Sequence, residues 1–193
     1  MRLELVALAA LAFATTAHGD GAELSMQATN VLTAMDTVPT PTELDSNFTD
    51  PLDSLAAIAQ GSGIDVGVRI RALHALASYC TAPCNTTDIA HEALVDFITA
   101  NEPNQDGTTI VMLRGAIEAI GPQRVGTDLP LLVPLLSHPS RDIRAATAHA
   151  LRDLCNTQAI TPLRAQQAQE ASDQVKLAIS EALRVLSQPS PCD

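Results

Sequence analysis

A short motif occurs four times in this chain and constrains its fold more than any other feature. Each copy starts with an aliphatic residue or Met and continues with residues rich in Ala and Leu. The copies span residues 68–76, 112–120, 143–151 and 175–183. Within and just after each copy, apolar residues recur with the spacing of one face of an α-helix. Repetition with a period of tens of residues predicts stacked helical units rather than one globular core.

A second helix is predicted ahead of each copy of the motif. Asp, Asn or Thr, which favour helix starts, precede an apolar stretch in each case, twice directly before Pro. The predicted helices cover residues 52–60, 89–100, 129–136 and 163–170. Short segments rich in turn-forming residues separate most of them from the motif helices. We therefore expect an all-α fold, an α-solenoid of about four stacked helix pairs over residues 50–187.

The segments outside this array have separate predicted roles. Residues 20–49 should form an N-terminal capping helix and a Pro/Thr-rich link, and residues 188–193 a C-terminal tail. Residues 1–19 have the features of a signal peptide: Arg2, an apolar run over 5–14, and small residues up to Gly19. An ordinary buried N-terminal helix is the alternative. We expect an exported protein, periplasmic or secreted, without membrane insertion after cleavage.

Composition narrows the classes of partner. The net charge is −11, with 22 acidic and 11 basic residues, and aromatic residues make up 2% of the chain. Such a chain repels nucleic acid and anionic membranes, and it has few rings on which bases could stack. The single Lys beside abundant Ala and Arg favours a bacterial source. We expect a monomer that binds a protein partner, whose identity the sequence does not give.

The four cysteines agree with export. An even number in an exported chain predicts disulfides, with three possible connectivities. Cys80 and Cys155 occupy equivalent repeat positions two repeats apart, which favours pairing Cys80 with Cys84 and Cys155 with Cys192. Zinc binding by Cys80 and Cys84 is the alternative, although no second pair of ligands accompanies them.

The chain resembles HEAT-repeat proteins over roughly residues 50–187. The family pattern is a helix, a tight turn with Pro and an acidic residue, then Val-Arg-x-x-Ala-x-x-Ala-Leu on a second helix. The copies at 68–76 and 143–151 match it best, whereas the second copy has Leu113 at the Arg position. The resemblance implies a structural ladder between repeats, formed by Arg or Lys with nearby Asp; the matching residues are Arg69, Arg144, Lys176, Asp65 and Asp142.

One column of polar residues appears when the four copies are aligned. His74, Glu118, His149 and Glu181 each follow the first motif residue by six positions. This position should face solvent on the second helices, which usually line the concave side of solenoids. Three interpretations stay open: unrelated polar residues, an ion-pair ladder, or a metal-binding stripe. Neighbouring repeats lie roughly 10 Å apart, which hinders several of these residues from reaching one ion.

No nucleophile or phosphate-binding motif is present, so we expect a non-catalytic binding module without cofactor or metal. The run 166–170 should form an exposed helix face. Binding is predicted on the concave face of the second helices, through Ile70, His74, Arg114, Glu118, His149, Leu177 and Glu181. The alternative is a metal-binding HEAT-like enzyme using His74, His91, Glu92 and His149. Deoxyhypusine hydroxylases of this type use several His-Glu pairs, and this chain has only His91-Glu92.

Overall fold

All the regular secondary structure in the described part of the chain is helical. The structure, a computed structural model, describes residues 26–33, 38–80 and 82–192, and no strand occurs among them. The predicted signal peptide lies outside the described residues. None of the described helices is long and apolar enough to cross a membrane.

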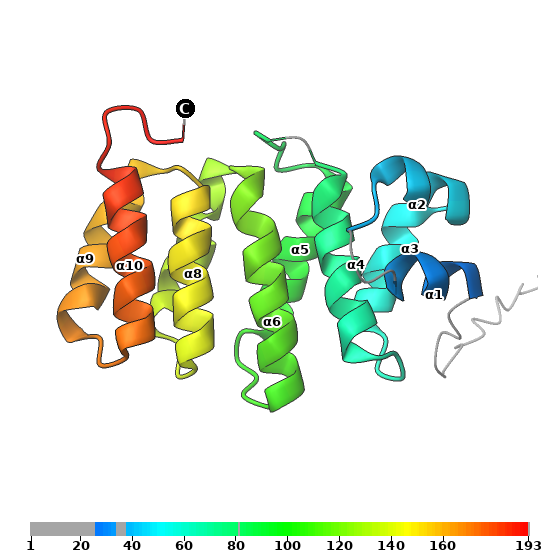
Figure 1. Ribbon diagram of the computed structural model, residues 1–193, viewed down its shortest axis with the longest axis horizontal. Coiled ribbons are helices and arrows are strands. Elements are labelled where there is room, and N and C mark those ends of the chain that lie inside the picture. Colours follow the sequence, from blue (N-terminus) through cyan, green and yellow to red (C-terminus); the bar gives the residue numbers. More distant parts are fainter. Residues whose placement is uncertain (1–25, 34–37, 81, 193) are drawn as a thin grey trace, which may run out of the picture.

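The helices form two layers (Figure 1). Each copy of the motif lies on a helix of the front layer: α4 (Val66–Ser78), α6 (Gly107–Ile120), α8 (Arg141–Asp153) and α10 (Asp173–Leu186). These four helices lie side by side and contact one another in order. Behind them lie α3 (Pro51–Gln60), α5 (Ile89–Asn101), α7 (Leu129–Leu132) and α9 (Ile160–Gln169). We call the outward surface of α4, α6, α8 and α10 the second-helix face.

Acidic side chains at the helix starts explain several element boundaries. Asp65 Oδ1 accepts hydrogen bonds from the backbone N–H groups of Gly67 and Val68 and thereby caps α4. Asp88 and Asp106 cap α5 and α6 in the same way. A carboxylate at this position satisfies free N–H groups and interacts favourably with the helix dipole. The start of each of these helices is therefore fixed by one side chain.

Two segments differ from the helices predicted. Residues in the expected N-terminal link form α2 (Pro41–Asn47), because Thr40 and Glu43 make a capping box and Pro41 occupies the first turn. The helix expected over 129–136 ends early at α7 and continues as a 3-10 helix, η3 (Val133–Ser137). Pro134 lacks the N–H that an α-helix needs at this point, and this favours the change.

Small residues at the motif positions allow the front helices to pack closely. The core consists mainly of Ala, Leu, Ile and Val, which are buried along α4, α6, α8 and α10. The 3-10 helix η1 (Gly121–Gln123), directly after α6, packs against α8. A Cβ atom on Gly121 would lie 2.7 Å from Ala150 Cα on α8. At the other end, α1 (Met26–Thr33) packs against α2 and α4.

Candidate functional site

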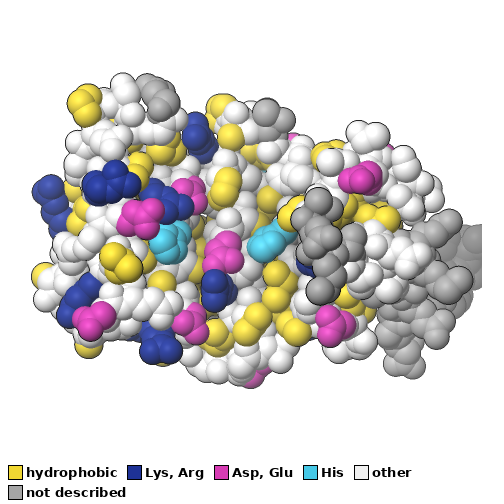
Figure 2. All heavy atoms as spheres, in the orientation of Figure 1, with side chains coloured by type: hydrophobic (Ala, Val, Ile, Leu, Met, Phe, Trp, Pro, Cys, Tyr) yellow, Lys and Arg dark blue, Asp and Glu magenta, His cyan; other side chains and the backbone are white. Residues whose placement is uncertain are grey.

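The predicted column of polar residues lies on one row of neighbouring helices. His74, Glu118, His149 and Glu181 come from α4, α6, α8 and α10, and each is half-buried. In Figure 2, histidine and acidic side chains alternate across the middle of the second-helix face. The residues that share one position in the aligned motif copies thus lie on successive neighbouring helices.

Contacts within this row depend on arginine rather than on direct His–Glu pairs. Arg152 Nη1 lies 2.8 Å from Glu181 Oε1 and 3.3 Å from His149 Nδ1. Since guanidinium groups only donate, Nδ1 of His149 is the acceptor and its proton resides on Nε2. Arg152 also donates to Asp153 on its own helix. Among the described residues, the contact between members of the column on neighbouring helices thus runs from α8 to α10 through Arg152, which lies outside the predicted set.

The other half of the row is more loosely connected. Arg114 Nε donates to Glu118 Oε1 at 2.7 Å, an exposed pair within α6. His74 lies over Gly115, since a Cβ there would be 3.9 Å from His74 Nε2 and 3.2 Å from Ile70 Cγ2. In the described part of the chain, no hydrogen bond or ion pair joins two members of the column to each other.

Apolar side chains complete the second-helix face. Leu177 on α10 is 71% exposed and Val111 on α6 is 46% exposed. Val111 was not among the predicted binding residues, because it stands just ahead of the motif copy and outside the aligned pattern. The face therefore combines exposed apolar surface with fixed charges.

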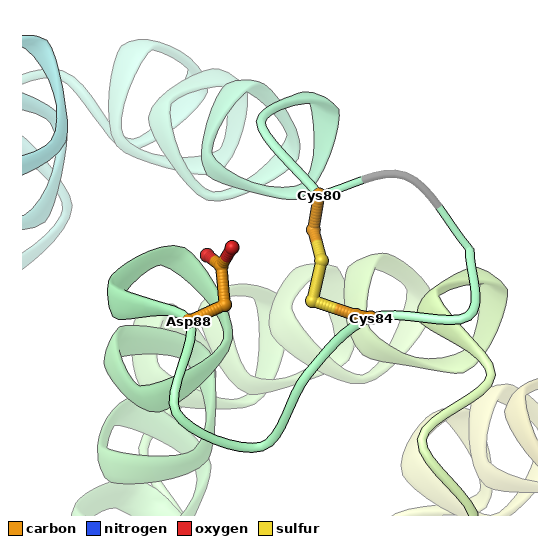
Figure 3. A group of neighbouring side chains, drawn as sticks. All are labelled: Cys80, Cys84 and Asp88. Atoms are coloured by element: carbon orange, nitrogen blue, oxygen red, sulfur yellow. A yellow bond between two sulfur atoms is a disulfide. The ribbon is translucent and has the colours of Figure 1, made fainter.

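The cysteines form the two expected pairs. Cys80–Cys84 and Cys155–Cys192 are disulfide-bonded, with Cα–Cα distances of 5.6 and 6.0 Å. The second bond attaches the C-terminal tail to the segment after α8. Asp88 lies beside Cys80 and Cys84 (Figure 3), and this is the one group of three potential metal ligands found among the described residues. Their sulfurs are bonded to each other and Asp88 caps α5, so this arrangement does not provide a zinc site.

A nearly buried ion pair joins α8 to the turn between α9 and α10. Arg144 Nε and Nη2 donate to the two carboxylate oxygens of Glu170, each at 2.8 Å. Arg144 Nη1 also donates to the carbonyls of His138 and Pro139. Gln166 and the backbone N–H groups of residues 171 and 172 complete the shell of Glu170. The hydrogen bonds from Arg144 lower the pKa of Glu170 to about 2, although burial opposes this shift.

The structure around Arg144 and Glu170 differs from two expectations. The run 166–170 was expected to be exposed, but Gln166 and Glu170 are buried. The resemblance implied Asp65 and Asp142 as partners in the ladder, yet Asp65 caps its own helix and Asp142 is paired with its neighbour Arg141 at 3.8 Å. Lys176 pairs with Asp173 on the same helix. The acidic partner of Arg144 is therefore Glu170, which lies outside the motif.

A second buried polar group surrounds His91 on α5. Its Nδ1 lies 2.7 Å from Gln123 Oε1 and its Nε2 lies 3.2 Å from Asp128 Oδ1. All three residues are at most 5% exposed. Burial raises the pKa of Asp128 to about 6, whereas the interaction with His91 lowers it. The sequence did not identify Gln123 and Asp128 as partners of His91. They lie 32 and 37 residues from it along the chain, and no motif connects them to it.

The His91 group borders a cavity of about 380 Å³ in the rear layer. Its lining includes Thr86, Glu92, Asp96, Thr127 and Asp128. Both ring nitrogens of His91 are already engaged. Among the described residues, no three of His74, His91, Glu92 and His149 form a group that could hold a metal ion.

Comparison with known proteins supports the resemblance to HEAT repeats over part of the chain. Residues 105–184, which extend from just before α6 into α10, match the family described as HEAT repeats. The motif copy at 68–76 lies outside the matched range. No curated protein and no solved structure matches the chain. The family match and the all-helical architecture together support a HEAT-repeat protein.

Proposed function

We propose that this protein is a non-catalytic protein-binding module that acts outside the cytoplasm. In this proposal it is an α-solenoid of four HEAT-like helix pairs with α1 as an N-terminal cap. HEAT repeats commonly serve as scaffolds for protein interaction, which supports this class of function. The apolar leader over residues 5–14 and the two disulfides support export to the periplasm or the extracellular space.

The observation that carries the proposal is the make-up of the second-helix face. Leu177 and Val111 expose apolar surface between charged groups, and Arg152 is held in position by Glu181 and Asp153. Protein interfaces combine apolar contacts with a polar rim, and pre-positioned side chains reduce the entropy lost on binding. The partner is expected to lie across α6, α8 and α10, where these features are continuous.

Charge reversal on this face tests the proposal. The mature chain would be immobilised and partners recovered from an extract of the extracytoplasmic fraction of the source organism. The variant Glu118→Lys/Glu181→Lys should lose the recovered protein, since it places two positive charges at the centre of the face and breaks the Arg114 and Arg152 pairs.

The matched control reverses two acids in the rear layer, Asp53→Lys/Glu102→Lys, both exposed. This control should recover the same partner as the unmodified protein. Equal recovery with both double variants would remove the second-helix face from consideration. Circular dichroism should show unchanged helix content in each variant, so that a loss of binding reflects the surface.

A further inference from the structure

We propose that a cavity at the C-terminal end of α8 binds a carboxylate group, carried either by a small organic acid or by the free end of a peptide. The cavity has a volume of about 370 Å³ and lies where η1, α8, α10 and the C-terminal tail meet. The tail turns back from α10 toward the end of α8 (Figure 1). The site adjoins the second-helix face, but binding of a small acid does not depend on the proposed protein partner.

The first argument is an unusual backbone conformation that gathers at this cavity. Within the described residues, three residues other than glycine have a positive φ: Arg124 (56°), Cys155 (59°) and Cys192 (71°). All three line the cavity. Residues other than glycine rarely adopt this left-handed conformation, because Cβ then crowds the backbone. Such residues cluster at ligand-binding sites, where the surrounding structure holds them in place.

The second argument is the identity of residue 124. The backbone N–H of Arg124 donates to the carbonyl of Gly121 at 3.2 Å and ends η1. Glycine or asparagine usually occupies a left-handed position at a helix end, because these residues adopt it most easily. Cys155 and Cys192 are accounted for by the disulfide between them. The backbone gives no such reason for arginine at position 124, which points to a role for its side chain.

The third argument is that no described residue uses this side chain. Arg124 is exposed, and none of the hydrogen bonds or ion pairs among the described residues involves its guanidinium group. In the same lining, Arg152 is paired with Asp153 at 2.7 Å and with Glu181 at 2.8 Å. Both acidic side chains of the lining are therefore engaged by Arg152. The N–H donors of Arg124 are left for an anion from outside the chain.

The charge and the wall of the cavity select a carboxylate among anions. A guanidinium group pairs with a carboxylate through two parallel hydrogen bonds. Asp153 and Glu181 lie in the same lining and repel a doubly charged phosphate more strongly than a singly charged carboxylate. Pro122, Val185 and the disulfide of the tail supply apolar wall for the stem of the acid. This disulfide also holds the tail in place before a ligand arrives, which reduces the entropy lost on binding.

The test measures binding of sodium pentanoate to the full chain by NMR chemical-shift titration. Amide signals around Arg124 should shift in a saturable manner. Pentanamide, which has the same stem without charge, and inorganic phosphate should each bind at least about tenfold more weakly, or about 1.4 kcal/mol. A short peptide with a free C-terminus, compared with the same peptide as its C-terminal amide, distinguishes a chain end from a free acid. Saturable binding of either carboxylate at this cavity supports the proposal.

The variant Arg124→Gly separates a binding role from a structural one. Glycine adopts the positive φ of residue 124 without steric cost, so the variant should unfold at a temperature close to that of the unmodified protein. It should nevertheless bind pentanoate at least about tenfold more weakly. Arg164→Gln changes an exposed arginine of α9 outside the cavity, and it should leave pentanoate binding unchanged.

A second variant covers the case in which Arg124→Gly does not fold. Val185→Trp fills the cavity from its apolar side and should weaken pentanoate binding to the same extent. Two results would overturn the proposal. One is that pentanoate and the free peptide bind no better than their amides or than phosphate. The other is that they bind the cavity variants as tightly as the unmodified protein.

Discussion

Helices α4 and α8 carry the two best copies of the same motif, yet their arginines have different partners. Arg69 on α4 donates from Nε to the carbonyl of Ala59 in the preceding helix, at 3.0 Å. Arg144 on α8 makes two hydrogen bonds to Glu170 and two to backbone carbonyls. The first connects helices within one pair, whereas the second joins α8 to the turn between α9 and α10, the two helices of the next pair.

The difference originates outside the motif. Glu170 stands five residues before Val175, the first residue of the following copy. The corresponding place for Arg69, five residues before Met112, is occupied by Gly107. Glycine has no side chain to accept from an arginine. The motif thus determines how the helices pack, while a residue in the turn determines whether a charged link forms between pairs.

The largest expected effect concerns the two disulfides, which close loops of different length near the two ends of the array. Replacing Cys155 and Cys192 by Ser should reduce the free energy of unfolding by about 4 kcal/mol, since the bond spans 37 residues. The same change at Cys80 and Cys84, four residues apart, should cost about 2 kcal/mol. Urea denaturation of both double variants measures this. Equal losses would show that loop length does not determine how much each disulfide stabilises the fold.

The next effect compares the two arginines directly. Arg144→Met should lower the free energy of unfolding by about 3 kcal/mol, because it leaves the carboxylate of Glu170 buried without its cation. Three other hydrogen-bond donors to Glu170 remain. We therefore expect a destabilisation near the lower end of the range found when one partner of a buried ion pair is removed. Arg69→Met should cost about 1 kcal/mol, the loss of one hydrogen bond. Both values come from denaturant unfolding.

A double variant shows whether the buried charge is responsible. Arg144→Met/Glu170→Gln should be more stable than Arg144→Met alone, since glutamine in this place carries no charge. A double variant as unstable as the single one would attribute the loss to packing of the arginine stem instead.

The helical architecture could be predicted because it depends on local patterns. Apolar residues at helical spacing and Asp or Pro at helix starts identify the helices from their own residues. The pairing of Cys155 with Cys192 was also accessible, from their positions in the repeat. The Pro/Thr-rich composition around Pro41 predicted a link, whereas Thr40 and Pro41 start α2, with a capping box formed by Thr40 and Glu43.

The polar groups could not be predicted in the same way, because their members are distant in sequence. Glu170 reaches Arg144 over 26 residues and Asp128 reaches His91 over 37. Neither pair has the periodicity of the motif, and a glutamate at a helix end resembles any exposed acid in sequence. The alignment of repeats revealed the column on the second-helix face, but the connecting Arg152 lies outside it.

A smaller effect compares two glycines, Gly121 in η1 and Gly115 in α6. Gly121→Ala should destabilise the protein by about 2 kcal/mol, because the new Cβ would lie 2.7 Å from the Cα of Ala150, which cannot move without its helix. Gly115→Ala should change stability by less than about 1 kcal/mol. Its Cβ meets the side chain of Ile70 at 3.2 Å, which can shift, and alanine favours the helix. Thermal unfolding of both variants is the measurement. Equal destabilisation would contradict the tighter packing of Gly121 in η1 against Ala150 of α8.

The smallest effect is a pH dependence that comes from Glu170 and has no counterpart at Arg69, whose hydrogen bond goes to a backbone carbonyl. The pKa of Glu170 is about 2 in the folded protein and near 4.5 as its ordinary value. A carboxylate with a lowered pKa stabilises the fold fully above its unfolded pKa, and this contribution is lost as the pH falls from about 4.5 toward 2. Between pH 6 and pH 4 the loss should stay below about 1 kcal/mol. Urea unfolding of Glu170→Gln over this range should show a shallower decline than the unmodified protein, whereas Arg69→Met should follow the unmodified slope. Parallel slopes for the unmodified protein and Glu170→Gln would mean that folding does not change the pKa of Glu170. Arg144 and Arg69 would then differ in the geometry of their hydrogen bonds and not in the electrostatic stabilisation of a partner.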